Sequence, residues 1–311
     1  MPFFSVIIPL FNKEKHIQDT LQCVLNQSFT YFEIIIINDG STDDSLKVLK
    51  KITDSRIIII DQENQGASHA RNTGLANAKG KFIALLDADD IWDCTFLENI
   101  NKAIIQYPNE YVFTSAIAYK YEKKTVPVRY SFKSKNNIIK LDYFKASQKY
   151  TILSGSSTIF KKTILKITGN FDETIKSGQD TDLWIRIGIN FPIIFVNKLL
   201  VYYIYNTSSL SNTTTNITHK PKFDKYKIEE QNNHYLKKFL DNNRFSLAIL
   251  SKLNNDLESY SYYRSNINES NLSLKKRLIL RLPKWILKLL LQIKKLKNTK
   301  THYPILTEIK S

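Results

Sequence analysis

The segment Lys81-Phe82-Ile83-Ala84-Leu85-Leu86-Asp87-Ala88-Asp89-Asp90 joins a short apolar run to three carboxylates. Residues 81–86 have the composition of a buried strand, so the acidic residues follow at its carboxyl end. In extended chain, residues i and i+2 point the same way, which lets Asp87 and Asp89 face one ligand. Adjacent carboxylates repel one another unless a cation lies between them, and Mg²⁺ or Mn²⁺ suits oxygen ligands. The alternative is an acidic loop in which Asp89 or Asp90 caps the next helix.

The sequence around this segment alternates strands with helices. Apolar, β-branched runs predict strands over 4–9, 33–38, 56–61 and 81–86, and helical spacing predicts helices over 13–27, 43–52, 67–78 and 93–106. This order predicts an α/β fold with right-handed crossovers and a mainly parallel sheet flanked by helices. Ligands of such sheets bind at the carboxyl ends of the strands, where Asp87 and Asp89 lie.

The alternation loosens after residue 110. We expect strands over 111–119, 157–160, 193–196 and 199–205, a loop or hairpin over 120–137 and a helix over 179–189. A Ser/Thr/Asn-rich tract over 206–218 is typical of a linker, and 223–240, 245–263 and 272–296 have helical character. These patterns predict one domain over 1–218, with halves 1–110 and 111–218, and a helical extension over 219–311.

The composition excludes several classes of protein. The 311 residues are 42% hydrophobic, which fits a globular chain, and two cysteines are too few for a disulfide framework, so we expect a reducing compartment. The first residues lack the basic leader of a signal peptide, and no run reaches the ~18 apolar residues of a membrane span. The net charge of +16 leaves nucleic acid, an anionic membrane or an anionic substrate as candidate partners.

Two more predicted strand ends carry polar residues. Asp39 ends the second strand and is followed by Gly40, which permits a tight turn. Arg71 lies in the helix predicted after the third strand, where its guanidinium could pair with Asp87 or with a phosphate. The alternatives are an ordinary strand-to-helix turn at Asp39, capped by Ser41, Thr42 or Asp43, and a surface arginine at position 71.

Together these segments resemble the family 2 glycosyltransferases, which have the GT-A fold. The resemblance runs in order over roughly the first 205 residues. It is carried by VIIPLFN at 6–12, NDGSTD at 38–43, Asn64-x-Gly66 with Ala70-Arg71-Asn72-x-Gly74, DADD at 87–90, and GQDxDLWxR at 178–186. Each block is short, but five blocks in order make a specific pattern.

The resemblance implies a role for each matching residue in donor binding. Pro9, Phe11 and Asp39 would hold the nucleotide base, Phe11 by stacking and Asp39 through a ring N–H. Arg71 would neighbour the base and Asp87, and Asp87-Ala88 would lie near the ribose. Asp89 would ligate Mn²⁺ or Mg²⁺. Glu14 falls on a position that is commonly acidic in the family.

Asp180 corresponds to the general base of the family, so it is the predicted catalytic residue. Without the resemblance, the better explanation of Asp180 and Asp182 is that they are acidic residues favoured at a helix N-terminus. Trp184 is expected in the core or in an acceptor platform. One departure concerns a stretch that in the family contains Arg and His, where this chain has Tyr203 and Tyr205; His219 lies downstream.

The resemblance implies inverting transfer of a hexosyl or N-acetylhexosaminyl group from a nucleoside-diphosphate sugar, with UDP-sugars expected most. The acceptor would be a glycan or lipid-linked hydroxyl in bacterial surface polysaccharide synthesis, such as lipopolysaccharide or capsule. Processive synthases of the family carry a QxxRW segment, which is missing here. The alternative is a catalytically inactive sugar-nucleotide or glycan-binding protein. A dinucleotide-dependent oxidoreductase is excluded because no G-x-G-x-x-G follows the first strand.

The positive charge is concentrated at the C-terminal end. On a helical wheel, one face groups Arg277, Arg281, Lys284, Lys288 and Lys295, and the other groups Leu278, Leu282, Ile286, Leu289, Leu290 and Ile293. With Trp285 near the boundary and Pro283 breaking or kinking the helix, the pattern predicts peripheral attachment to an anionic membrane, at the cytoplasmic face. The alternative is an apolar face packed on the catalytic domain. Nucleic acid is not expected, because no base-reading motif appears.

Overall fold

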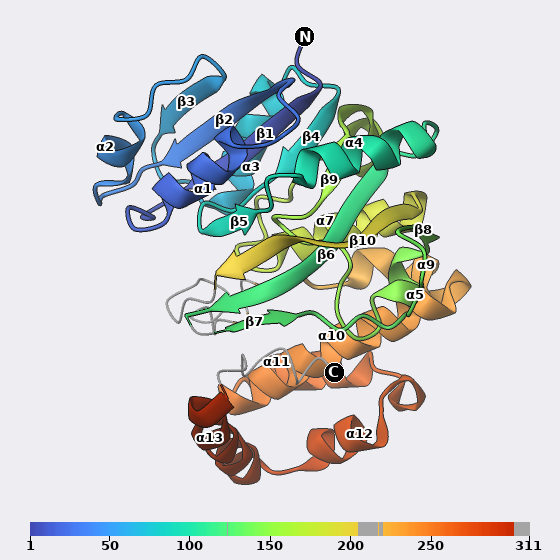
Figure 1. Ribbon diagram of the computed structural model, residues 1–311. Helices are drawn as coiled ribbons and strands as arrows, with labels where there is room; N and C mark the ends of the chain where they lie inside the picture. The colour runs from blue at the N-terminus through green and yellow to red at the C-terminus, as the bar shows by residue number, and fades with distance from the viewer. Residues whose placement is uncertain (123, 205–216, 218–219, 302–311) are drawn as a thin grey trace. The chain divides into compact units, whose positions relative to one another are not determined.

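The computed structural model describes residues 1–122, 124–204, 217 and 220–301, with side chains described as far as Ile293 (Figure 1). The chain divides into two compact units. One comprises Met1–Val128, Phe132–Tyr143 and Thr151–Tyr205; the other comprises Arg129–Ser131, Phe144–Tyr150 and Asn206–Ser311. Each unit is described by itself.

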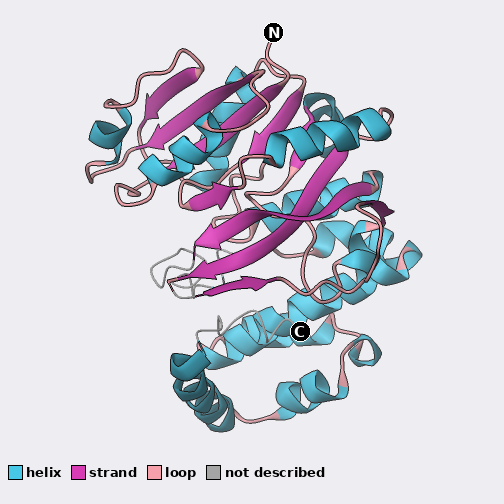
Figure 2. Ribbon diagram, in the orientation of Figure 1, coloured by secondary structure: helices cyan, strands magenta, loops and turns pink. Residues whose placement is uncertain are grey.

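The first unit is built on one mixed sheet in the order β3-β2-β1-β4-β9-β6-β10-β5 (Figures 1 and 2). Four strands at one side are mutually parallel: β1 (Phe4–Leu10), β2 (Phe32–Asp39), β3 (Ile57–Gln62) and β4 (Phe82–Leu85). Strands β1, β2 and β4 consist almost entirely of buried residues, as expected for parallel strands covered on both faces. The predicted parallel α/β half is therefore confirmed.

The second half of the sheet mixes directions. Strand β9 (Ile159–Lys161) runs antiparallel to both β4 and β6 (Val112–Tyr121), and β10 (Ile193–Ile204) runs parallel to β6. Three short strands pair antiparallel to these: β5 (Asp90–Trp92) and β8 (Ile138–Leu141) with β10, and β7 (Lys124–Pro127) with β6. Strand β10 is continuous where we expected two strands, because the Asn197-Lys198 region is absorbed as a shift in register.

Helices cover the sheet on both faces. Helices α1 and α4 lie in front of the sheet in Figure 1, and α3 packs against β1 and β2. A Cβ at Gly74 of α3 would lie 2.8 Å from Ile37 Cδ1, so glycine allows the close approach that sets the position of this helix. The helices are α1 (Ile17–Leu25), α2 (Ser45–Leu49), α3 (Ala67–Asn77), α4 (Phe96–Gln106), α5 (Tyr143–Ala146), α6 (Leu165–Thr168) and α7 (Gln179–Asn190), with a 3₁₀ turn η1 (Lys162–Ile164).

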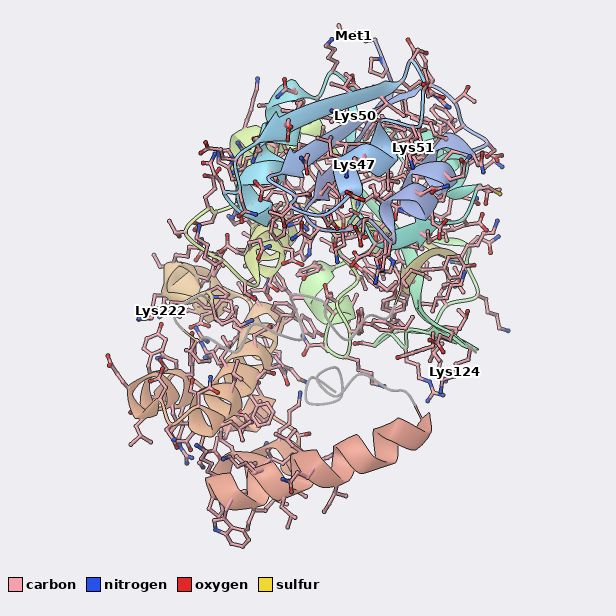
Figure 3. The ribbon with its side chains drawn as sticks, turned by 90° about the vertical axis from the view of Figure 1, so that its left-hand side faces the viewer. Met1, Lys47, Lys50, Lys51, Lys124 and Lys222 are labelled. Atoms are coloured by element: carbon pink, nitrogen blue, oxygen red, sulfur yellow. The ribbon has the colours of Figure 1, made fainter. Side chains whose placement is uncertain are left out.

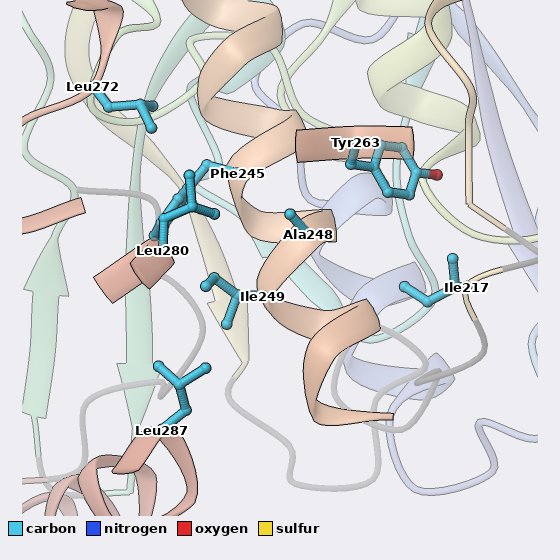
Figure 4. Close-up of a cluster of buried hydrophobic side chains, with 8 residues drawn as sticks. All are labelled: Ile217, Phe245, Ala248, Ile249, Tyr263, Leu272, Leu280 and Leu287. Carbon is cyan, nitrogen blue, oxygen red and sulfur yellow. The ribbon is translucent and has the colours of Figure 1, made fainter. Parts of the chain in front are cut away.

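The described part of the second unit, from Asp224 on, is helical. Its elements are η3 (Asp224–Tyr226), α9 (Lys227–Asn232), α10 (His234–Leu253), α11 (Leu257–Ser265), η4 (Glu269–Asn271), α12 (Leu274–Arg281) and α13 (Lys284–Thr301). Asn233 separates α9 from α10 and caps the latter, accepting a hydrogen bond from the Leu236 N–H. Figure 4 shows the core of this unit, formed by Ile217, Phe245, Ala248, Ile249, Tyr263, Leu272, Leu280 and Leu287.

Pro283 breaks the predicted C-terminal helix into α12 and α13. Leu282, the residue before the proline, has an extended conformation, as proline requires of its neighbour. Most apolar side chains of the predicted face are exposed: Leu278, Leu289, Leu290 and Ile293, together with Leu274 and Trp285. Some basic side chains bond within the unit instead, as Arg277 does to the Ser270 and Leu272 carbonyls. Lys295 lies beyond the described side chains.

Candidate donor-binding site

Asp39 lies buried at the carboxyl end of β2 and organises the loop that follows β3. Its carboxylate accepts hydrogen bonds from Gln62 Nε2 (2.8 Å) and from the backbone N–H groups of Gln65 (3.0 Å) and Gly66 (2.8 Å). Gly66 adopts φ +92°, a conformation that favours glycine, and it begins helix α3. The bonds of Asp39 therefore fix the entry to the helix that carries Arg71.

Arg71 and Asp87 form a mostly buried ion pair between α3 and the end of β4. Arg71 Nη2 donates to Asp87 Oδ1 at 2.6 Å, and the arginine side chain is only 8% exposed. The neighbouring charges of Asp87 and Asp180 raise the pKa of Arg71, against the opposing effect of its burial. The second terminal nitrogen, Nη1, is buried and has no hydrogen-bond partner among the described residues. A buried cation with a free donor beside an acidic strand end is suited to bind an anion.

Gly155 gives Asp87 its space. A Cβ at this position would lie 2.7 Å from Asp87 Oδ2. The Asp87 backbone N–H also donates to Ser156 Oγ at 3.1 Å. The segment before β9 therefore adjoins Asp87 at its backbone N–H and at Oδ2, whereas Arg71 binds Oδ1.

Asp89 is paired with a different cationic side chain from that of Asp87. Lys13 Nζ forms an ion pair with Asp89 Oδ2, and both side chains are largely buried. Ala88, between the two aspartates, is buried, and its carbonyl accepts a hydrogen bond from Thr20 Oγ1 at 3.1 Å. A hollow of about 370 Å³ lies along α1 beside Asp89, and its lining includes His16, Thr20 and Lys120.

Asp90 belongs to the sheet, which corrects its assignment as a possible helix cap. It begins β5, is buried, and accepts hydrogen bonds from Ser156 Oγ (2.5 Å) and the Ile204 N–H (3.3 Å). Burial, together with the charges of Asp89 and Asp87, raises the pKa of Asp90 well above its ordinary value. The N-cap of α4 is Thr95, so neither Asp89 nor Asp90 caps that helix.

Among the residues that the structure describes, this site offers a divalent cation too few side-chain ligands to hold it alone. No group of three or more His, Cys, Asp or Glu side chains among the described residues is arranged to hold a metal ion by itself. Mg²⁺ is commonly held by one or two carboxylates together with substrate phosphates and water. Asp89 fits a site of that shared kind, because its carboxylate already receives a cation.

The turn after β1 brings three predicted residues to the same edge of the sheet. Pro9 is half-buried, and the Phe11 ring is 43% exposed, as a stacking surface must be. Asn12 has φ +51°, and its Oδ1 accepts the Thr42 N–H at 2.8 Å. Glu14 Oε2 accepts the Asp44 N–H at 3.0 Å, so the structure shows it holding the β2–α2 loop.

Asp180 lies half-buried in the first turn of α7, close enough to Arg71 for its charge to raise the arginine's pKa. The segment before α7 rests on α3, where Asn72 Nδ2 donates to the Phe171 carbonyl and the Phe171 ring lies 5.3 Å from the Arg71 guanidinium. The structure therefore brings Asp180 into the surroundings of Arg71 and Asp87.

The neighbours of Asp180 on α7 are structural. Asp182 is fully buried and paired with Arg186, whose Nη2 lies 2.9 Å from Asp182 Oδ2. Arg186 also donates to the Thr168 and Asn170 carbonyls. Trp184 is 2% exposed and belongs to the core, as one of its two predicted roles required.

Tyr203 occupies the position where the resemblance would place an arginine. Its ring lies 5.8 Å from that of Tyr119. Burial and the nearby Asp90 and Asp87 carboxylates raise the pKa of the Tyr203 hydroxyl well above its usual value, so the side chain is neutral. Tyr205 and His219 lie outside the described residues.

The first 168 residues settle the family. Residues 5–168 match the model of Glycosyl transferase family 2. The chain belongs to this family. Four of the five resemblance blocks, including Asp87 to Asp90, lie inside the matched range together with Lys13, Gly155 and Ser156. The block at residues 178–186 lies outside it.

Curated relatives of this family 2 chain extend the match. It is 36% identical over 214 residues to the Escherichia coli protein described as UDP-Glc:alpha-D-GlcNAc-diphosphoundecaprenol beta-1,3-glucosyltransferase WfaP, covering 68% of this chain and 80% of WfaP. It is 30% identical over 223 residues to the Streptococcus pneumoniae glycosyltransferase GlyA, covering 68% of this chain but only 32% of GlyA. The match thus spans about a third of the length of GlyA.

The fold of the family 2 chain is also found among solved structures. The Staphylococcus aureus protein TarS superposes with a TM-score of 0.64 at 22% identity, covering 87% of this chain and 50% of that chain. A structure of TarS residues 1–349 in complex with UDP-GlcNAc gives a TM-score of 0.60 at 21% identity, covering 86% and 93%. The predicted GT-A fold is confirmed by this likeness.

Three residues of the site were not found by sequence reasoning. They are Lys13, Gly155 and Ser156, and each lies far along the chain from the acidic run that it adjoins. Lys13 is 76 positions from Asp89, and Ser156 is 69 positions from Asp87. The polar run Ser154-Gly155-Ser156-Ser157 just before a predicted strand was the available signal.

Proposed function

We propose that this family 2 chain is an inverting glycosyltransferase that uses a nucleoside-diphosphate sugar. The observation that carries the proposal is the cluster of Arg71, Asp87, Asp89 and Asp180, in which one nitrogen of the buried guanidinium has no partner among the described residues.

Donor recognition in this proposal uses residues 1–110. Phe11 offers an exposed ring for stacking on the base, and Asp39 offers a carboxylate for a ring N–H. Arg71 holds Asp87 in place for the ribose. Pro9, Glu14 and Ala88 shape the loops around these three residues.

Asp180 is the proposed general base. Its carboxylate would accept the proton of the acceptor hydroxyl as that oxygen attacks the anomeric carbon, a role worth about 10²–10⁴-fold in rate. Asp89 would hold Mn²⁺ or Mg²⁺, which supplies charge stabilisation for the departing nucleoside diphosphate. The residues 111–218 would then form the acceptor side.

The names of similar proteins support a UDP-sugar and a surface-glycan acceptor. WfaP is described as transferring from UDP-Glc to a diphosphoundecaprenol-linked sugar, TarS was solved with UDP-GlcNAc, and a Bacillus subtilis relative, 31% identical over 208 residues, is described as the minor teichoic acid biosynthesis protein GgaA. We infer a hexosyl or N-acetylhexosaminyl donor and a glycan or lipid-linked acceptor in surface polysaccharide synthesis.

The test compares UDP release from UDP-glucose and UDP-GlcNAc, with Mn²⁺, by the unmodified chain and by Asp180→Asn. We expect release to fall at least about 100-fold while the affinity for UDP stays within about twofold. Glu98→Gln, on the exposed side of α4, is the matched control and should behave as the unmodified chain. Equal turnover in Asp180→Asn refutes the assignment, and no release by any form favours the inactive binding protein.

We also infer peripheral attachment to an anionic membrane at the cytoplasmic face, where nucleotide sugars are available. No helix among the described residues combines the length and apolarity needed to cross a membrane. Helix α13 exposes Trp285, Leu289 and Ile293 at a spacing of four residues, and residues 284–301 contain six lysines and no acidic residue. An exposed apolar stripe within a basic helix is typical of interfacial binding.

A further inference from the structure

Two of the three carboxylates of the acidic run are paired with cationic side chains, and the third is buried. Asp87 is paired with Arg71, and Asp89 is paired with Lys13. Asp90 is buried between Ser156 and the Ile204 N–H. A divalent cation at Asp89 must therefore compete with the Lys13 ammonium.

The backbone of Lys13 is fixed, whereas its side chain is long. Its N–H donates to Ser45 Oγ at 2.8 Å, and its carbonyl accepts the N–H groups of His16 and Ile17 at 2.9 Å each. The flexible four-carbon stem of a lysine lets the ammonium move while the backbone stays in place. Lys13 can therefore leave Asp89 without disturbing the turn that leads into α1.

We propose that Lys13 is the resident counter-ion of Asp89, that a divalent cation displaces it, and that the released ammonium then pairs with the donor diphosphate. The inference rests on the metal role proposed for Asp89. It makes Lys13 a residue that binds the donor and also opposes premature metal binding.

Electrostatic repulsion favours the exchange. An ammonium and a divalent cation on the same carboxylate repel each other, and the repulsion is stronger in a partly buried site than in water. The donor diphosphate brings negative charge to the metal, so the Lys13 ammonium can pair with a phosphate oxygen near the Asp89 carboxylate that it leaves. Lys13 should then weaken metal binding without nucleotide and strengthen nucleotide binding with metal.

The experiment measures both affinities in the full chain. Mn²⁺ binding without nucleotide is followed by electron paramagnetic resonance, and UDP binding at saturating Mn²⁺ by calorimetry. For Lys13→Met we expect Mn²⁺ to bind about fivefold more tightly and UDP about tenfold more weakly. Lys47→Met is the matched control, because Lys47 also pairs with an aspartate, Asp44, but is 77% exposed on α2 (Figure 3).

The opposite signs separate this role from a structural one, since a misfolded site would weaken both ligands. Lys13→Gln provides a second variant, and the unfolding midpoint of each variant shows whether the chain folds. Unchanged affinities, or two changes in the same direction, overturn the inference while leaving the metal site intact. Absence of Mn²⁺ binding in every form, with or without UDP, overturns the metal role of Asp89 as well.

Discussion

Arg71 Nη2 lies 2.6 Å from Asp87 Oδ1, and this bond joins helix α3 to the end of strand β4. The pair has two consequences. It fixes the carboxylate proposed to meet the ribose, and it leaves Arg71 Nη1 buried, with no partner in the part of the chain that the structure describes. Asp180 adds a second negative charge to the surroundings of the same guanidinium.

Replacing this arginine should therefore affect donor binding strongly. In Arg71→Met, Asp87 loses its cation and faces Asp180 without compensation, so we expect UDP affinity to fall at least about tenfold. Calorimetry with UDP measures the effect. Arg56→Met removes an ion pair with Asp54, at the start of β3, and serves as the control. Equal losses in the two variants would contradict a specific role for Arg71.

Gly155→Ala should displace Asp87. The added methyl would lie 2.7 Å from Asp87 Oδ2, and the carboxylate cannot move freely because Arg71 holds its other oxygen. We expect weaker UDP binding with little change in the unfolding midpoint. Gly188→Ala is the comparison, because its methyl would meet the Tyr143 ring in the core and should lower stability instead. UDP affinity equal to that of the unmodified chain would refute the prediction.

Asp54 predicts a pH dependence of stability. Hydrogen bonds from Arg56 lower the pKa of Asp54 to about 2, from an ordinary value of 3.8. A lowered carboxyl pKa stabilises the folded state above pH 3.8, and that stability is lost as the pH falls toward about 2. Asp54→Asn should lower the free energy of unfolding by about 1 kcal/mol at pH 7, after allowance for solvent screening. Urea titrations should show this difference shrinking below pH 4; a constant difference would exclude the mechanism.

Helix α13 should control vesicle binding. Trp285→Ser with Leu289→Ser removes two exposed apolar side chains, and we expect flotation with phosphatidylglycerol vesicles to weaken more than about tenfold. Leu257→Ser is the control: Leu257, the first residue of α11, is more exposed than Trp285 and Leu289 but lies between Asp256 and Glu258. Binding that is unaffected by the double substitution, or equal on neutral vesicles, would argue against the proposed attachment.

The first half of the fold could be predicted from sequence because its signals are local. Runs such as residues 33–38 specify a buried strand by composition, and β2 appears there. Strand β5 has only three residues, and its partner β10 lies more than a hundred residues later, so no local pattern predicts it. Strand β10 was expected as two strands for a different reason: Asn197 and Lys198 interrupt its apolar pattern without ending the strand.

The site shows the same division. The acidic run follows a strand that the sequence predicts, and Arg71 lies in a predicted helix. The structure brings Arg71 and Asp87 into contact. The ion pair between Lys13 and Asp89 spans 76 positions, and a lysine in a polar turn has no feature that distinguishes it from a solvated one. Such contacts depend on how the strands are ordered in the sheet, which is known only once the chain is folded.

Ser156 links the donor edge to the interior of the first unit. Its hydroxyl meets both the Asp87 N–H and the Asp90 carboxylate, and its carbonyl accepts the Trp92 indole N–H at 2.6 Å. Trp92 in turn packs on Phe96, with ring centroids 4.5 Å apart. A core substitution at either aromatic residue would thus reach the acidic strand end through a single serine. Defects in the core of this unit should be detected as lost nucleotide affinity before the chain unfolds, which makes ligand binding the more sensitive assay of its integrity.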